Sequence, residues 1–347
     1  PKQRSLPSYR ICWRNNISKR SEAIRHSTAV NRSCYNSAVR TVYIIALDLG
    51  VERTVLMICD LLGQNCRLHQ YNCPLERDTS IDFLLQLIRN QIRLLPATPF
   101  GVVGIGIGIH GTVCRNEITF TPNYDLADLP IKDTLEDALE IPVWLENEAN
   151  LSALAEKTFV ENHKNLIHVS IHAGVGAGII LDHHLYTGLA GTAGEAGHMI
   201  VQPGGRSCPC GNHGCLEQYI SEPAVLSRYR ELSGRTTVSI DDLVWAYNQK
   251  ETAALAVTDE FTTYLACGIN NLWNLFSPEC IILNSQLTAY LPQLLPEILQ
   301  KLSPRFRATC HLKLSTLQDT GVLLGAARVC ISKYLGTEKL YFSGLQP

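Results

Sequence analysis

The sequence has no long hydrophobic run and no excess of charge of either sign. Its 347 residues carry 30 Lys and Arg against 32 Asp and Glu, so no global field attracts nucleic acid. Apolar stretches such as 100–109 and 171–181 are too short or too rich in glycine to span a bilayer. The N-terminus opens polar and basic, unlike a signal peptide. We therefore expect neither secretion nor membrane insertion.

A disulfide scaffold is also disfavoured, although the chain contains 13 Cys. Most of them stand singly in apolar surroundings, as Cys59, Cys267 and Cys280 do, and a chain of this length does not need such a scaffold. A charged fraction of 18% and a mean hydropathy close to zero are typical of globular proteins. We expect reduced thiols and a cytoplasmic location.

The chain exceeds the usual size of one compact core, which predicts two domains. Residues 1–42 carry nine Lys or Arg against one acid, Glu22, and predict a basic N-terminal arm or the remnant of a DNA-binding domain. Residues 43–157 predict a small α/β domain, and 158–321 predict a large one. The final segment, 322–347, is expected to pack on the small domain.

Three successive strand-like segments around short turns predict an antiparallel meander that opens the first domain, and the second domain resembles it in outline. The expected strands lie at 43–48, 55–60, 65–73, 102–109, 143–146, 166–171, 178–181 and 280–283. The expected helices lie at 81–95, 131–139, 151–155, 217–232, 240–248, 251–275, 287–302 and 322–334. Two α/β halves with a cleft between them follow from this layout.

The sharpest local signal is a loop rich in Cys and Gly within residues 194–217. His198, Cys208, Cys210 and Cys215 together offer one imidazole and three thiolates, the ligands of a closed, structural zinc site. The alternative is a set of reduced thiols or a disulfide, but a Cys-x-Cys pair spans too short a loop for an unstrained bridge. His213 is the competing ligand; its place inside the loop makes the same ion harder to reach.

A second cluster of polar residues follows the strand at 143–146, at the end where open α/β sheets bind ligands. Asn147, with Glu195, His198 and Glu217, offers an amide, carboxylates and an imidazole, which suit the hydroxyl groups of a sugar. In the alternative interpretation Asn147 and Asn150 cap the following helix, and Glu148 is a first-turn carboxylate favoured by the helix dipole.

Gly174, Gly176 and Gly178 form a glycine-rich turn between two expected strands. Such a turn can lay backbone N–H groups against phosphate, but it also suits a plain hairpin. The Gly-Lys-Ser/Thr of a Walker motif is missing, so this feature alone is a weak indication of phosphate binding.

These motifs resemble the ROK family (repressors, open reading frames and sugar kinases) over residues 43 to about 335. The anchor is Gly194-Glu-Ala-Gly-His198 with the cysteine loop up to Glu217, and further matches include Asp48-Leu-Gly50, Pro122-Asn123 and Gly325-Ala-Ala327. The resemblance implies an actin-like, hexokinase-type α/β fold of two domains with a central cleft and a zinc-binding loop. It implies sugar ligands at Asn123, Asn147, Glu195, His198 and Glu217.

The first phosphate loop departs from the kinase branch of this family. Val51 and the anionic Glu52 follow Asp48-Leu-Gly50 where the kinases have glycine and threonine, so we expect repulsion of ATP. Asp48, Gly50, Gly174, Gly176 and Gly178 are then remnants of phosphate loops.

Three further motifs also depart from the kinases. His172 and Ala173 stand where they carry Gly-Thr, residues 283–286 lack their paired glycines, and His110 replaces a proline. Glu148 occupies the position of the catalytic aspartate, and one added methylene displaces a base whose placement is critical. Glu148 is therefore catalytic only if the chain is a kinase.

The resulting prediction is a sugar-responsive repressor, closest to the N-acetylglucosamine repressor and Mlc-type regulators. It would bind a hexose or N-acetylhexosamine, free or phosphorylated, or a sugar-transport protein, as a homodimer or homotetramer with structural zinc and without ATP. One alternative is an ATP-dependent kinase for glucose, N-acetylglucosamine or N-acetylmannosamine, and another is a scaffold that binds no sugar. Such repressors carry a winged helix-turn-helix, for which 42 residues are too few. DNA contact would then depend on a degenerate or missing N-terminal domain.

Overall fold

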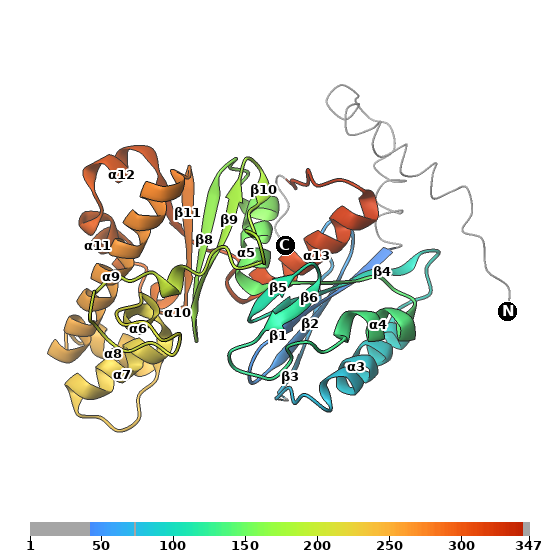
Figure 1. The fold of residues 1–347 in the computed structure, drawn as a ribbon, viewed down its shortest axis with the longest axis horizontal. Coiled ribbons are helices and arrows are strands. Elements are labelled where there is room, and N and C mark those ends of the chain that lie inside the picture. Colours follow the sequence, from blue (N-terminus) through green and yellow to red (C-terminus); the bar gives the residue numbers. More distant parts are fainter. Residues whose placement is uncertain (1–41, 73, 343–347) are drawn as a thin grey trace.

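The computed structural model describes residues 42–72 and 74–342, which form two lobes, each built on one mixed sheet (Figure 1). The basic arm expected over residues 1–42 lies outside the described residues, apart from Val42, the first residue of strand β1. The expected α/β architecture of two halves is therefore present in the described chain.

The first sheet has the strand order β3-β2-β1-β4-β7. Its strands are β1 (Val42–Leu49), β2 (Thr54–Cys59), β3 (Arg67–Tyr71), β4 (Gly101–Ile109) and β7 (Val143–Asn147). Antiparallel pairing of β1 with β2 and of β2 with β3 confirms the predicted meander. Parallel pairing of β1, β4 and β7 brings the carboxyl ends of these three strands to one edge.

The second sheet repeats this topology in the order β10-β9-β8-β11-β12. Its strands are β8 (Leu166–Ile171), β9 (Val175–Leu181), β10 (His184–Leu185), β11 (Cys280–Ser285) and β12 (His311–Leu314). Since β9 begins at Val175, the expectation of a glycine turn reaching Gly178 was wrong, and only residues 172–174 connect β8 to β9. Strand β12 and the hairpin β5 (Thr112–Cys114) to β6 (Glu117–Phe120) were not predicted from the sequence.

Helices α3 (Ser80–Leu94) and α4 (Ile131–Leu139) pack on one face of the first sheet. In α3 the buried residues Leu84, Leu87, Ile88 and Gln91 recur at the spacing of one helical face. The chain leaves the helix at Leu95, because Pro96 disfavours a helical conformation in the residue before it.

Seven helices of the second lobe accompany its sheet. They are α6 (Glu217–Ile220), α7 (Glu222–Ser233), α8 (Ile240–Asn248), α9 (Thr252–Phe276), α10 (Gln286–Tyr290), α11 (Leu294–Lys301) and α12 (Pro304–Thr309). Two predicted helices proved to be interrupted. Ser221 breaks the first, since its extended backbone and hydroxyl cap α7, and Pro292 lies at the break of the second. Among the helices described, none is long and apolar enough to cross a membrane.

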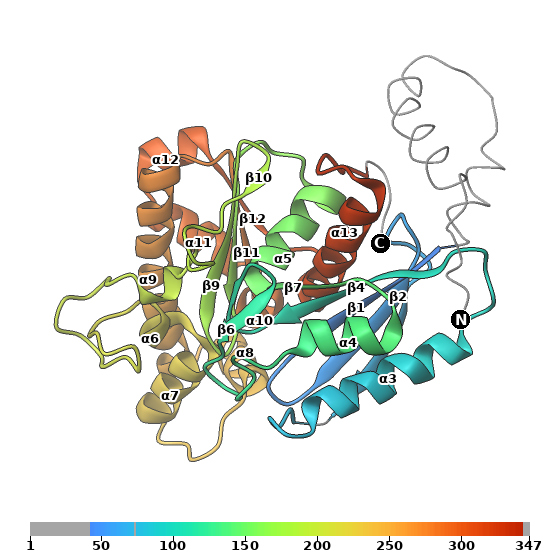
Figure 2. The ribbon, with the colours of Figure 1, turned by 45° about the vertical axis from the view of Figure 1, so that its right-hand side comes forward.

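Helices α5 (Glu148–Ala155) and α13 (Gly321–Leu335) lie between the two sheets (Figure 2). Helix α5 continues into a π-helical turn at Glu156–Val160. Helix α13 packs on β1 and β4, and α5 packs on β8 and β9. The order of layers from one lobe to the other is therefore sheet, α13, α5, sheet.

Three glycines let these layers approach backbone to backbone. A Cβ atom on Gly106 of β4 would lie 2.5 Å from the Ala326 carbonyl oxygen of α13. One on Gly325 of α13 would lie 2.0 Å from the carbonyl oxygen of Leu151, in α5. One on Gly178 of β9 would lie 2.3 Å from the Ala149 carbonyl oxygen, also in α5. The two lobes are thus joined through contacts that leave no room for a side chain.

A Gly325→Ala substitution is expected to lower the free energy of unfolding by about 1 to 3 kcal/mol, the usual effect of overpacking. Alanine is the better helix former, so the loss must come from the contact with Leu151. The matched control is Gly321→Ala in the same helix, where the nearest atom lies at an ordinary 3.4 Å. Urea unfolding measures both variants, and equal stability of the two would contradict the contact.

Candidate functional site

His198, Cys208, Cys210 and Cys215 converge, with one ligand atom from each lying within 4.8 Å of the others. The Sγ atoms of Cys210 and Cys215 are 3.7 Å apart, and Cys208 Sγ lies 3.6 Å from His198 Nδ1. A tetrahedral zinc ion with its usual bond lengths would separate two sulfurs by about 3.8 Å, and a sulfur from a nitrogen by about 3.6 Å. This cluster could therefore hold a four-coordinate metal ion.

Tight backbone turns bring the three sulfurs together. Gly211 and Gly214 adopt φ angles of +93° and +84°, which glycine tolerates best, and a Cβ on Gly214 would lie 1.7 Å from the Gln202 carbonyl oxygen. A backbone hydrogen bond from Asn212 lowers the pKa of the exposed Cys210 thiol to about 7, which favours the metal-binding thiolate. His213 is exposed and lies outside the cluster, so the geometry favours His198 as the fourth ligand.

The carboxylates expected to bind sugar, Glu195 and Glu217, lie at the two ends of this loop, residues 194–217, which we call the metal loop. Glu195 Oε2 is 4.0 Å from His198 Nε2, the ring nitrogen that does not face the sulfurs. Glu217 begins α6, and its Oε2 accepts a hydrogen bond of 3.0 Å from the backbone N–H of Val175, just after the β8–β9 turn. Burial raises the pKa of Glu195, and the nearby charge of Glu217 raises it further. Two acids and one imidazole nitrogen are therefore close together.

Asn147 caps helix α5. Its side-chain oxygen accepts hydrogen bonds from the backbone N–H groups of Ala149 and Asn150, at 2.9 and 3.0 Å. Its amide nitrogen donates to the Gly111 carbonyl and to Glu148. The alternative interpretation as a cap therefore holds for Asn147, and its contact with sugar remains a prediction.

Asn150 is not a cap, which corrects that part of the same interpretation. It lies inside the first turn of α5 and donates to Glu146 Oε1 at 3.0 Å. Glu148, the first residue of the helix, is half-buried, and its partial removal from water raises its pKa. The charge of Glu195 acts in the same direction, so Glu148 and the acids beside the metal loop are close enough to interact.

An ion pair lies at the first phosphate loop. His110 Nε2 donates to Asp48 Oδ1 at 2.8 Å. Burial opposes the charged imidazole, but the hydrogen bond to Asp48 and the charges of Asp48 and Glu148 raise the pKa of His110 to about 9. Tyr124 supports this arrangement, since its hydroxyl accepts from the His110 N–H and donates to the Leu49 carbonyl. The structure thus adds His110 as a charged centre and Tyr124 as its support, and the sequence carried no spacing signal for either role.

The other residues of the phosphate loops lie nearby. Gly50 lies in the β1–β2 turn, where Arg53 pairs with Asp319 at 3.5 Å. A Cβ on Gly174 would lie 3.1 Å from Glu217 Oε2, and one on Gly176 would lie 3.6 Å from Glu148 Oε1. Gly174 therefore faces the predicted sugar ligand Glu217 and Gly176 faces Glu148, while Gly178 packs against α5.

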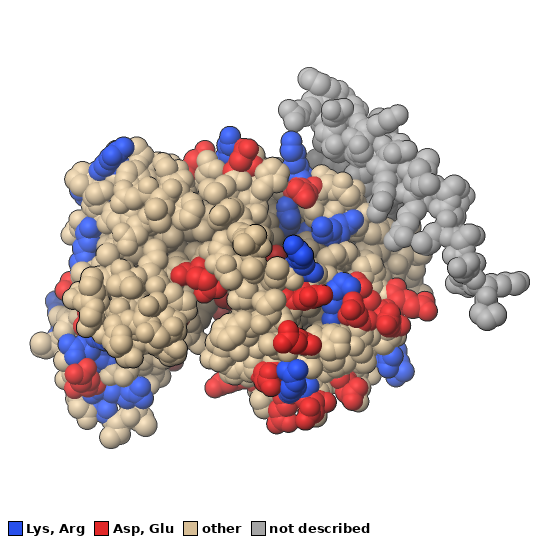
Figure 3. All heavy atoms as spheres, viewed as in Figure 1, with Lys and Arg blue, Asp and Glu red and all other residues tan. Residues whose placement is uncertain are grey.

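Asn123 is the predicted ligand that the structure does not join to the others. It is exposed, and no hydrogen bond or ion pair among the described residues links its side chain to them, although the neighbouring Tyr124 contacts His110. Figure 3 shows a hollow between the two lobes, with acidic side chains along its edge. The predicted ligands other than Asn123 thus come together from both lobes.

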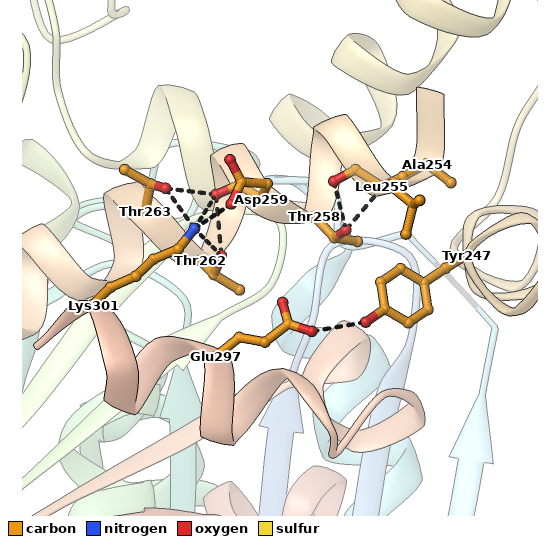
Figure 4. Close-up of polar contacts among 9 residues, drawn as sticks. All are labelled: Tyr247, Ala254, Leu255, Thr258, Asp259, Thr262, Thr263, Glu297 and Lys301. Carbon is orange, nitrogen blue, oxygen red and sulfur yellow. Dashed lines mark hydrogen bonds and ion pairs between the residues drawn. The ribbon is translucent and has the colours of Figure 1, made fainter. Parts of the chain in front are cut away.

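A recess of about 640 Å³ lies elsewhere, along α9 and the end of α11. Figure 4 shows that Lys301 points at Asp259, Thr262 and Thr263 there, and its ammonium group donates to all three. This lysine ties α11 to α9, and the recess has none of the acids described above. We therefore place the candidate site between the lobes.

Known proteins resemble the chain over most of its length. A "Xylose repressor" from Bacillus spizizenii is 34% identical over 310 residues, which are 86% of this chain and 79% of that protein. A crystal structure of a ROK family transcriptional regulator, homologous to the Escherichia coli MLC protein, has a TM-score of 0.76 at 26% identity and covers 89% of this chain and 84% of its own.

A third similarity concerns the fold alone. The ROK family glucokinase from Streptomyces griseus, solved with glucose and AMPPNP, has a TM-score of 0.70 at 23% identity and covers 83% of this chain and 98% of its own. These neighbours confirm the predicted actin-like, hexokinase-type fold. The model of the ROK family matches residues 44–333. The chain therefore belongs to the ROK family, as its motifs predicted.

Proposed function

We propose that the chain is a sugar-responsive regulator of the repressor type, which binds its effector between the two lobes. The observation that carries this proposal is the convergence of Glu195, His198 and Glu217 beside the metal loop, with Glu148 close to Glu195. Carboxylates and an imidazole nitrogen suit several hydroxyl groups at once. The similarity to xylose repressors supports the regulator branch and adds xylose to the hexoses and N-acetylhexosamines to be tested.

The charges favour an uncharged sugar over a sugar phosphate. Asp48, Glu148, Glu195 and Glu217 contribute carboxyl groups, whereas the imidazolium of His110 is already paired with Asp48. The nearby guanidinium of Arg53 pairs with Asp319. A phosphate would therefore meet acids and no unpaired cation among the groups described at the site, so the hydroxyl groups of the sugar carry its recognition.

Structural zinc at His198, Cys208, Cys210 and Cys215 completes the proposal. Their spacing fits a tetrahedral ion, and four protein ligands leave no open position for chemistry on a substrate. The ion would hold the loop that carries Glu195 and leads to Glu217. Metal and sugar affinity are therefore expected to be coupled.

The family includes sugar kinases, but we expect this chain to have no kinase activity. Glu52 places a negative charge in the first phosphate loop. Asp48, the acid of that loop, is already paired with His110. We expect no ADP above background from MgATP with xylose, glucose, N-acetylglucosamine or N-acetylmannosamine. A Glu148→Ala variant sets that background in a coupled assay. Sugar-dependent ADP formation by the wild type, lost in this variant, would instead support a kinase with Glu148 as general base.

We propose that DNA contact depends on a missing or degenerate N-terminal domain, of which the basic arm, 1–42, is the remnant. Apart from Val42, this arm lies outside the described residues. We propose that the chain divides into a small domain, 43–157, and a large domain, 158–321, and that helix α13, which packs on β1 and β4, belongs to the small one. A homodimer or homotetramer, and a sugar-transport protein as partner, are consistent with a regulator of sugar use.

A further inference from the structure

The side chain of Arg206 extends from the metal loop and contacts helices α6 and α9. It lies two positions before Cys208, and its guanidinium donates to the Gln218 carbonyl at 2.8 Å and to the Glu260 carboxylate. The guanidinium also lies over the ring of Tyr219, 4.5 Å from its centre. The Tyr219 hydroxyl accepts from the backbone N–H of Arg206 at 2.9 Å. Both the backbone and the side chain of Arg206 are therefore held.

The groups that receive Arg206 are themselves fixed. Glu260 lies on α9 and also accepts from Arg228 of α7, at 3.2 Å. The ring of Tyr219 stacks on Tyr264 of α9, with centroids 4.0 Å apart. Glu260 and Tyr219 are largely buried, which limits solvent screening of the ion pair. Helices α6, α7 and α9 thus form one platform under the loop.

Arg206 reaches the metal ligands by two routes. Its backbone carbonyl accepts from the N–H of Gly214, the residue before Cys215, at 2.7 Å. Its guanidinium donates to the backbone carbonyl of Gln218, and the side-chain nitrogen of Gln218, Nε2, lies 3.6 Å from Cys208 Sγ. Gln218 directly follows Glu217, so the same contact also orients the start of α6. One residue is therefore connected to two cysteine ligands and to one predicted sugar ligand.

We propose that Arg206, held by Glu260, is a positioning residue that sets the geometry of the metal ligands and of Glu217. The inference rests on the proposed metal site. An arginine suits this role because two nitrogens of its planar guanidinium donate to the Gln218 carbonyl and to the Glu260 carboxylate at the same time. A lysine has one ammonium nitrogen and cannot reproduce this geometry. Mutation of a residue that orients a metal ligand typically lowers metal affinity tenfold to a hundredfold.

Arg235 offers a matched control, because it repeats the arrangement away from the metal loop. It pairs with Glu251 at 2.8 Å, and its guanidinium lies 5.4 Å from the ring centre of Tyr229. A purely structural role predicts that Arg206→Lys and Arg235→Lys behave alike. A positioning role predicts that only Arg206→Lys alters the metal site.

The experiment loads the wild type and both lysine variants with cobalt and records the visible absorption of the ion. Zinc affinity is then measured by competition with a chelator, and folding by thermal melting without metal. We expect Arg206→Lys to bind zinc about tenfold to a hundredfold more weakly, with a changed cobalt spectrum. Arg235→Lys is expected to match the wild type in both. Glu260→Gln, which keeps the shape of the acceptor, is expected to show a smaller change in the same direction.

Unchanged zinc affinity and cobalt spectrum in Arg206→Lys would overturn the positioning role while leaving the metal site intact. The same changes in Arg235→Lys would also overturn it, since the effect would then be general destabilisation. Failure of the wild type to take up cobalt or zinc would instead overturn the metal site itself. If Arg206→Lys does not fold, the decision passes to Glu260→Gln, whose unchanged spectrum would count against the proposal.

Discussion

We expect the wild type to carry about one metal ion per chain and a Cys210→Ser variant to lose it. Cys210 is exposed, so the substitution removes a thiolate without opening a cavity in the core. The fall in affinity should exceed the roughly tenfold to hundredfold change seen when an outer partner of a metal ligand is lost. Sugar affinity should fall with it, because His198 and Glu195 belong to the same loop.

Metal analysis after gentle purification measures this directly, with Cys66→Ser as the control. Cys66 is also exposed but lies in the other lobe, between β2 and β3, so its variant should retain the ion. Wild-type protein without metal would refute the site. Metal retained by the Cys210→Ser variant would shift the ligand set toward His213.

We expect the chain to bind a sugar without phosphorylating it, and the affinity to depend on Glu195 and Glu217 more than on Glu148. Each of the first two can accept hydrogen bonds from sugar hydroxyls, and an unmet hydrogen bond in a desolvated cleft is not replaced by water. Glu195→Ala and Glu217→Ala should each lose about 1 to 3 kcal/mol, or about tenfold to a hundredfold in affinity. Glu148→Ala should lose less, because no phosphoryl transfer is being organised.

Calorimetry with xylose, glucose, N-acetylglucosamine and their phosphates tests this prediction. Glu217 also holds the N–H of Val175, so Glu217→Gln, which keeps one acceptor oxygen, separates contact with sugar from support of the turn. Exposed Glu231, in α7, provides a neutral alanine control. Absence of binding to every sugar by folded, metal-loaded wild type would favour a scaffold that binds only protein. Tighter binding of the phosphates would contradict the preference for an uncharged sugar.

Patterns of apolar residues predicted most of the fold because each sheet opens with two strongly apolar, buried strands separated by a short turn. They missed β12 and the β5–β6 hairpin, because these strands have only three or four residues each. They also merged helices across Ser221 and Pro292, where a cap and a ring without an N–H end the hydrogen-bonding pattern locally. Element type was therefore predictable where the periodic pattern was long.

The candidate site was predictable where ligand chemistry implies a spacing, as it does for Cys208, Cys210 and Cys215. The ion pair joins Asp48 of β1 to His110, the residue directly after β4, so the pairing of these two strands brings them together. Arg206 likewise meets Glu260 across 54 positions of sequence. Such contacts depend on tertiary packing, which local patterns do not encode.

The glycine contacts between the layers have a mechanical consequence. Side chains that interlock can change rotamer and absorb a gradual shift, but the main chain at Gly106, Gly178 and Gly325 has no rotamer to change. Helix α5 should therefore slide as a rigid rod, carrying Glu148 at one end, while its other end runs into the turn where Glu156 accepts a hydrogen bond from Ser315. Closure around a sugar would then be a step between two discrete packed arrangements of the layers. At a sugar concentration that fills only some of the sites, the sample would be a mixture of open and closed molecules, without a half-closed form.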